Sequence, residues 1–346
     1  MPPYLAEPWC QFIAELGFTP TLDGPYDTLM QGWRATIGKL AARYTFPAPD
    51  PTIHTEDLIA DGVRVRMYTP PPDTDSEPPT SNLPLALYFH AGGWIMGSVD
   101  EEDGFVRALC KLTHSTILSV AYRLAPAHRF PAPLDDCVAV ARWALARFPT
   151  AQLTLIGASA GGNLALATAL SLLDADADAD ADAEDALSAR IAGVACLAPV
   201  TIHPDAVPTN LKERYTSYAE NDRCTVNTGS AMRTFFECYG APPGDPRVSV
   251  LLHAKVAGLR RVYLAVGGAD TLRDDVRLFV ERLEEEKKEG EEGEEGGGGG
   301  GVVAVRWDEF AGFPHFSWLF PAEVLRPHQA EFMGNLVRGV KWVQEE

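Results

Sequence analysis

Short apolar runs alternate with amphipathic stretches along most of the chain, and this pattern predicts the order of its elements. Residues 63–68 alternate apolar and polar side chains with period two, which predicts a half-buried strand. Residues 85–89 are almost continuously apolar, which predicts a strand covered on both faces. Further strand-like runs occupy 115–121, 153–156, 191–197, 261–266 and 302–307.

Helical spacing of apolar residues fills several of the intervals between these runs. It is clear at 135–148, where Val138, Trp143 and Leu145 recur before Pro149. The alternation predicts an α/β fold in which helices flank a mainly parallel central sheet. Ligands of such sheets bind beyond the carboxyl ends of the strands. The other helical stretches cover 105–112, 164–173, 276–283 and 327–343.

Four segments do not follow the alternation. Residues 1–50 and 203–245 are rich in aromatic residues and prolines, and we expect them to form a cap over the strand ends or an extension of the core. Residues 174–186 carry seven acids and no base, and residues 284–301 carry eight acids, two lysines and a glycine run. Such compositions favour disordered surface insertions, with an acidic interaction tail as the alternative.

The two insertions hold 13 of the 19 net negative charges, so most of the net charge of −19 lies in these two segments. The remaining body is mildly acidic, which disfavours nucleic-acid binding. No apolar run approaches the length of a membrane span, and the first residues lack the pattern of a secretory signal. The six cysteines show neither a Cys-x-x-Cys pair nor metal-ligand spacing. We therefore expect a reduced, cytoplasmic protein without a metal or cofactor, and a homodimer stays open.

The strongest candidate for chemistry is Ser159, within the sequence Gly157-Ala158-Ser159-Ala160-Gly161. An apolar run precedes it and an Ala/Leu-rich run follows, so the pattern predicts a strand, a sharp turn and a helix. A serine on such a turn projects its hydroxyl beyond the strand end. The alternative is a turn whose small residues only allow close packing, so a base and an oxyanion site must be found elsewhere.

Two later segments supply the partners that Ser159 needs. Asp270 follows the apolar run 261–266, and His315 lies on a loop after the run 302–307. Taken alone, Asp270 could be a helix N-cap and His315 a turn histidine packed among aromatic residues. Their order after the serine is that of a Ser-Asp-His triad on an α/β sheet. For the oxyanion, Gly92 and Gly93 follow an apolar strand, and the N–H of Ala160 follows the nucleophile.

The chain resembles the hormone-sensitive-lipase-like branch of the α/β-hydrolase superfamily. The resemblance covers about residues 55–340 apart from the insertions, and it implies one domain over 1–346 with 1–50 and 203–245 as cap. It implies a serine hydrolase that cleaves esters of small or medium acyl groups through an acyl-enzyme. The matching blocks are His90-Ala91-Gly92-Gly93-Trp94, Tyr122-Arg123-Leu124-Ala125-Pro126, Gly157 to Asn163, and Asp270 to Asp275 with His315.

The sequence departs from that family at three positions. Ala91 replaces the first glycine of the His-Gly-Gly-Gly loop, and Ala158 replaces an acidic residue before the serine. His315 is followed by Phe316 where the family has glycine, which predicts a loop shortened by one small residue. Two other functions stay open: a dehydratase, acyltransferase or cyclase of specialised metabolism at the same site, and a non-catalytic small-molecule receptor. His315 argues against the receptor, because receptors of this type lose that histidine.

Overall fold

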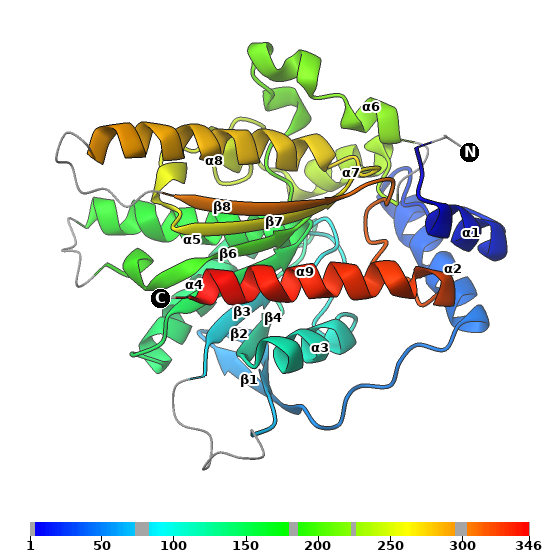
Figure 1. Ribbon diagram of the computed structural model, residues 1–346, viewed down its shortest axis with the longest axis horizontal. Helices are drawn as coiled ribbons and strands as arrows, with labels where there is room; N and C mark the ends of the chain where they lie inside the picture. The colour runs from blue at the N-terminus through cyan, green and yellow to red at the C-terminus, as the bar shows by residue number, and fades with distance from the viewer. Residues whose placement is uncertain (1–3, 73–82, 180–185, 223–225, 295–302, 346) are drawn as a thin grey trace.

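The computed structural model describes residues 4–345 apart from 73–82, 180–185, 223–225 and 295–302, and a single sheet runs through its centre (Figure 1). The strand order is β1-β2-β4-β3-β5-β6-β7-β8. Strand β2 pairs antiparallel with both β1 and β4, and every other neighbouring pair is parallel. This arrangement confirms the predicted mainly parallel α/β fold. The strands are β1 (His54–Ala60), β2 (Val63–Thr69), β3 (Leu85–Phe89), β4 (Thr116–Val120), β5 (Leu153–Ala158), β6 (Ile191–Leu197), β7 (Arg261–Gly267) and β8 (Ala304–Phe310).

The two edge strands differ most from the sequence prediction. Strand β1 was not predicted, because only Ala60 of its seven residues is buried and its polar side chains hide the period of two. A tight turn at Asp61 and Gly62, both with positive φ, joins it to β2. Strand β8 begins at Ala304 and ends at Phe310, later than predicted, because an edge strand tolerates polar residues such as Asp308.

Helices cover both faces of the sheet (Figure 1). Helices α3 and α9 pack together on one face, whereas α4, α5 and α8 cover the other. Each of these helices was predicted: the ends of α3 and α9 differ by one or two residues, and the largest differences are at the ends of α5 and α8. Their bounds are α3 (Asp103–Thr113), α4 (Ala132–Arg147), α5 (Ala160–Asp178), α8 (Arg273–Glu294) and α9 (Arg326–Gln344).

Helices α5 and α8 extend into both acidic insertions, which corrects the prediction that 174–186 and 284–301 are disordered throughout. Residues 174–178 and 284–294 are helical. In α5, Asp174 pairs with His253 and Lys255, and Asp176 accepts hydrogen bonds from two backbone N–H groups. Alanine has the highest helix propensity, so these few partners suffice to continue the helix. Residues 180–185 and 295–301 of the two predictions lie outside the described residues.

The N-terminal region and the segment 203–245 lie together at the carboxyl ends of the parallel strands (Figure 1). Leu22 bridges Asn227, and the Thr228 hydroxyl donates to the Leu22 carbonyl at 2.9 Å. The helices of these regions are α1 (Glu7–Leu16), α2 (Tyr26–Arg43), α6 (Ser217–Asn221) and α7 (Gly229–Tyr239). Short 3-10 helices occupy Ser188–Arg190, Pro204–Ala206, Thr209–Arg214, Val250–Leu252, Val256–Gly258 and Glu323–Leu325.

Candidate active site

Ser159 occupies the turn between β5 and α5 and adopts φ 54° and ψ −118°. The residues two positions before and after it must be glycine: a Cβ at Gly157 would lie 2.1 Å from the Gly161 carbonyl oxygen, and a Cβ at Gly161 would lie 2.0 Å from the Phe89 carbonyl oxygen. Among the described residues, no side chain or backbone group makes a hydrogen bond with Ser159 Oγ. The turn therefore presents an unengaged hydroxyl at the carboxyl end of the sheet.

Asp270 and His315 form a buried pair at the same edge of the sheet. Asp270 follows β7 and His315 follows β8, and His315 Nδ1 donates to Asp270 Oδ2 at 2.6 Å. The other carboxylate oxygen accepts the Leu272 N–H at 2.9 Å, so Asp270 forms a turn just before α8 begins at Arg273 and is not the N-cap of that helix considered from sequence. The pair leaves Nε2 of His315 as the ring nitrogen available to a further partner. His315 makes no hydrogen bond to Ser159 in this structure, as is common for catalytic groups without a substrate.

The residue after His315 adopts a backbone conformation that side chains rarely take. Phe316 has φ 60°, in the left-handed region that favours glycine. Its ring lies 4.5 Å from that of His315 and 5.5 Å from that of Trp318. The chain therefore keeps the turn with a phenylalanine, and aromatic packing holds it.

A buried polar contact fixes the next residue of this loop. Ser317 Oγ and His328 Nε2 lie 2.9 Å apart, and the His328 ring stacks on Phe313 with centroids 3.5 Å apart. Burial lowers the pKa of His328 to about 4, so the ring is neutral at physiological pH. His328 lies in the predicted helical stretch 327–343, and no local motif in the sequence marks its contact with Ser317.

The loop after β3 carries Gly92 and Gly93, both with positive φ. A Cβ at Gly92 would lie 2.1 Å from the Met96 carbonyl oxygen, and one at Gly93 would lie 2.4 Å from the Phe235 ring of α7. No acceptor among the described residues takes the N–H of Gly92, Gly93 or Ala160. These N–H groups can therefore donate to a ligand, and the Ala160 N–H lies at the N-terminal, positive end of the α5 dipole.

The carbonyl groups of His90, Ala91 and Gly92 instead accept hydrogen bonds. The Tyr122 hydroxyl donates to the His90 carbonyl and the His90 ring donates to the Ala91 carbonyl, both at 2.8 Å. Burial lowers the pKa of His90 to about 4, so this ring is neutral too. The Gly92 carbonyl accepts the N–H groups of Ile95 and Met96 at 3.0 Å. These bonds orient the loop while leaving the glycine N–H groups unpaired.

Segment 203–245 holds the residues around Asp270 in place. Asn221 of α6 donates to the Asp270 carbonyl at 2.8 Å, and Ser217 donates to the Thr271 carbonyl at 2.6 Å. Asp274 in turn accepts the Ser217 N–H at 2.7 Å. The sequence offered no signal for these contacts, because each joins residues about fifty positions apart.

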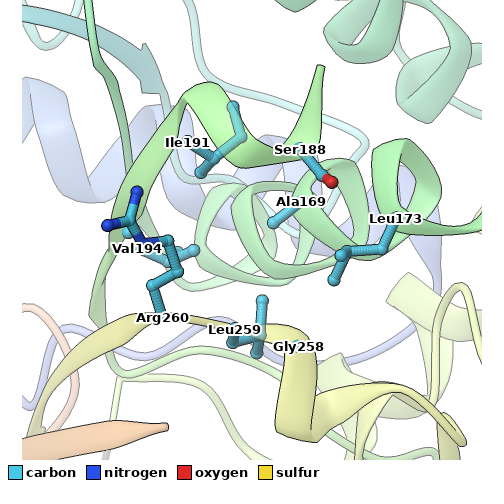
Figure 2. Close-up of a pocket in the computed structure, with 9 residues that line it drawn as sticks. Ala169, Leu173, Ser188, Ile191, Val194, Gly258, Leu259 and Arg260 are labelled. Carbon is cyan, nitrogen blue, oxygen red and sulfur yellow. The ribbon is translucent and has the colours of Figure 1, made fainter. Parts of the chain in front are cut away.

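The cavity drawn in Figure 2 lies away from these groups. Its lining includes Ile191, the first residue of β6, together with Leu173 and Gly258, whereas the candidate site follows the opposite ends of the strands. Among the described residues, no group of His, Cys, Asp and Glu could hold a metal ion. No described helix is long and apolar enough to cross a membrane.

Known proteins similar to this chain agree with the geometry. The profile of a family with the α/β-hydrolase fold matches residues 86–298. The versiconal hemiacetal acetate esterase of Emericella nidulans is 54% identical over 91% of this chain and 100% of that protein. The esterase of the same name from Aspergillus parasiticus is 44% identical over 98% of each. The structure of vibralactone cyclase, 23% identical over 99% of this chain and 96% of that one, has a TM-score of 0.76, a likeness of fold alone. The chain therefore belongs to the α/β-hydrolase family, in its hormone-sensitive-lipase-like branch of ester hydrolases.

Proposed function

We propose that this esterase uses Ser159 as nucleophile, His315 as general base and Asp270 as the group that orients the histidine. The observation that carries the proposal is the buried hydrogen bond of 2.6 Å between Asp270 and His315, at the sheet edge that also bears the strained Ser159. A carboxylate bonded to Nδ1 fixes the tautomer in which Nε2 can accept the serine proton. The same bond argues against the receptor alternative, in which the histidine has no role.

The reaction proceeds in two halves on these groups. Ser159 Oγ attacks the ester carbonyl carbon while its proton passes to His315 Nε2, and the resulting oxyanion accepts the N–H groups of Gly92, Gly93 and Ala160. The C–O bond to the alcohol then breaks, and His315 returns the proton to the leaving alkoxide oxygen. A water molecule next attacks the acyl-enzyme with His315 again as base, which releases the carboxylic acid and restores Ser159.

We propose an acetate ester of a hemiacetal as the substrate. The two fungal relatives are named for versiconal hemiacetal acetate, and both align with almost the whole chain. The Phe235 ring packs directly on Gly93, which leaves little room beside the proposed oxyanion donors and supports a short acyl group. Residues 1–50 and 203–245 form the cap over this site in the proposal. The five described free cysteines are compatible with the reduced, cytoplasmic setting that we propose.

The test measures hydrolysis of nitrophenyl esters with acyl chains from two to ten carbons. We expect acetate to give the highest kcat/KM. Ser159→Ala should lower kcat by about 10⁴-fold or more, and His315→Ala by a similar factor, because members of a triad act as a unit. Ser171→Ala, in the same helix as the nucleophile turn, and His54→Ala, on the exposed edge strand, serve as matched controls and should keep wild-type rates.

Several outcomes would contradict the proposal. Activity retained in Ser159→Ala would exclude the nucleophile. A wild-type enzyme that reacts with a fluorophosphonate at Ser159 but hydrolyses no ester would favour the specialised biosynthetic reaction. A preference for acyl chains of eight carbons or more would leave the triad standing and remove the acetate assignment.

A further inference from the structure

Glu102 is a buried carboxylate that the proposed triad does not use. It lies where the chain enters α3, and it is 9% exposed although Asp100 and Glu101 beside it face solvent. One carboxylate oxygen accepts the Ala91 N–H at 2.9 Å, and the other accepts the Tyr88 hydroxyl of β3. The residue it holds, Ala91, directly precedes the two glycines of the proposed oxyanion site.

We propose that Glu102 is a positioning residue that sets the orientation of the Gly92 and Gly93 N–H groups through its bond to Ala91. This inference rests on the proposed function, because it needs those two N–H groups to bind the oxyanion. Ala91 is held at both polar ends: its N–H by Glu102 and its carbonyl by His90. The two peptide planes that flank Ala91 are thereby fixed, the first by Glu102 and the second, which carries the Gly92 N–H, by His90.

A carboxylate is needed here because it accepts hydrogen bonds from two buried donors. Ala91 N–H and the Tyr88 hydroxyl are both buried, and a buried donor left without an acceptor is costly. Removing Glu102 would favour a rotation of the loop that hydrates the Ala91 N–H, and the glycine N–H groups would turn with it. Oxyanion donors act on the transition state more than on the bound ester, so the effect should appear in kcat.

The ionisation of Glu102 determines the pH at which the variants must be compared. Burial raises the pKa of Glu102 to about 7, while its bonds to Tyr88 and Ala91 oppose that rise. The titratable groups that face it are Tyr88 from β3, Tyr122 after β4 and Glu101 beside it. At pH 9 the carboxylate is ionised and accepts both bonds, so variants are compared there.

The experiment measures kcat, KM and the inhibition constant of an acetyl-type trifluoromethyl ketone, whose hemiketal oxyanion mimics the transition state. Glu102→Ala should lower kcat by 10- to 100-fold and change KM less than threefold, and it should weaken the inhibitor by the factor lost in kcat/KM. Glu102→Gln should stay within about fivefold of wild type, because its amide oxygen still accepts Ala91 N–H. Tyr88→Phe keeps the Ala91 bond and should also stay within fivefold. The exposed neighbour Glu101→Gln is the matched control and should behave as wild type.

Fluorophosphonate titration gives the concentration of folded sites, so a loss of folded protein does not enter kcat. The inference is overturned if Glu102→Ala keeps kcat within threefold of wild type, if its loss lies in KM alone, or if Glu102→Gln loses as much as Glu102→Ala. Failure of the proposed function would be seen in a different variant. In that case Ser159→Ala would still hydrolyse esters, whatever the kcat values of the Glu102 variants.

Discussion

The turn at Ser159 and the turn at Phe316 both require a positive φ and are held differently. Each places a residue other than glycine at positive φ, 54° at Ser159 and 60° at Phe316. Beside Ser159, two glycines are required because backbone oxygens lie where their Cβ atoms would be. Beside Phe316, no glycine is present, and side chains hold the turn through ring contacts and the Ser317 to His328 bond.

This difference explains why one turn is easily found in a sequence and the other is not. Where a backbone oxygen occupies the place of a Cβ atom, only glycine fits, so the sequence shows a short local motif. The turn at Phe316 is held by the rings of His315 and Trp318 and by His328 of α9, and such side-chain contacts leave no short motif of fixed residues. The two turns should therefore respond differently to substitution.

The largest effect is expected where backbone blocks the added atom. Gly161→Ala places a Cβ 2.0 Å from the Phe89 carbonyl oxygen, so the turn or the neighbouring strand must move. We expect a loss of roughly 4 kcal/mol in the free energy of unfolding, together with most of the esterase activity. Denaturant unfolding and nitrophenyl acetate hydrolysis measure the two losses.

The matched control for this change is Gly104→Ala in α3, where a Cβ meets no atom within 4 Å. It should raise stability by up to about 1 kcal/mol, because alanine is the better helix former. A Gly161→Ala enzyme as stable as wild type would show that the nucleophile turn is more adaptable than its packing indicates.

The histidine loop should lose less from His328→Phe, which keeps a ring on Phe313 but removes the partner of Ser317. We expect a loss of about 1–3 kcal/mol at pH 7.5, the usual cost of a buried polar atom left unpaired. A tenfold lower kcat should accompany it as His315 loses its fixed position. Combining His328→Phe with Ser317→Ala should recover part of the stability. No recovery in the double variant would show that the bond is not what holds the loop.

The difference in stability between wild type and His328→Phe should also depend on pH, in a direction that the lowered pKa of His328 determines. The pKa of His328 is about 4 in the folded protein and near 6.5 when unfolded, so its neutral burial contributes stability that is lost as pH falls from 6.5 to 4. The stability advantage of wild type over His328→Phe should shrink by about 2 kcal/mol across that window. Thermal unfolding of both proteins at several pH values measures it, and a constant advantage would contradict the burial of a neutral ring.

The smallest effect separates the cost of backbone conformation at Phe316 from the value of its ring. Phe316→Gly and Phe316→Ala both remove the ring, but only alanine keeps the cost of the left-handed conformation. We expect the glycine variant to be more stable than the alanine variant by about 1 kcal/mol. Unfolding midpoints compare them directly, and equal midpoints would mean that the turn relaxes once the ring is gone.

Sequence patterns predicted the parallel strands and their helices because buried strands are nearly continuous in apolar residues. They missed β1, whose polar side chains face solvent, and they ended α5 and α8 too early because the acidic runs at the ends of these helices were interpreted as disordered. In α5, the acids were also interpreted without their distant partners. For Asp174 these partners are His253 and Lys255, which no local pattern could indicate.

At the site, Asp270 and His315 were predicted from their order and their places after strands, and the structure brings them into contact. Glu102 escaped prediction for a physical reason. It stands in a run of four acids, 100–103, which is typical of a solvated surface, and only its position above Tyr88 and Ala91 turns it inward. Asp103 of the same run is also buried, and the burial of two acids in such a run depends on tertiary contacts that sequence does not display.

The hydrogen bonds between α6 and the loop after β7 limit how this protein can be recombined with its relatives. Asn221 and Ser217 bind the backbone of Asp270 and Thr271, and Tyr215 donates to Asp275 at 2.7 Å. A chimera that exchanges segment 203–245 alone would leave these acceptors facing foreign side chains and displace the acid of the proposed triad. In the proposed function, where segment 203–245 is part of the cap, substrate preference and catalytic geometry would therefore be inherited as one block. New specificity would then be reached more readily by single substitutions than by exchanging the segment.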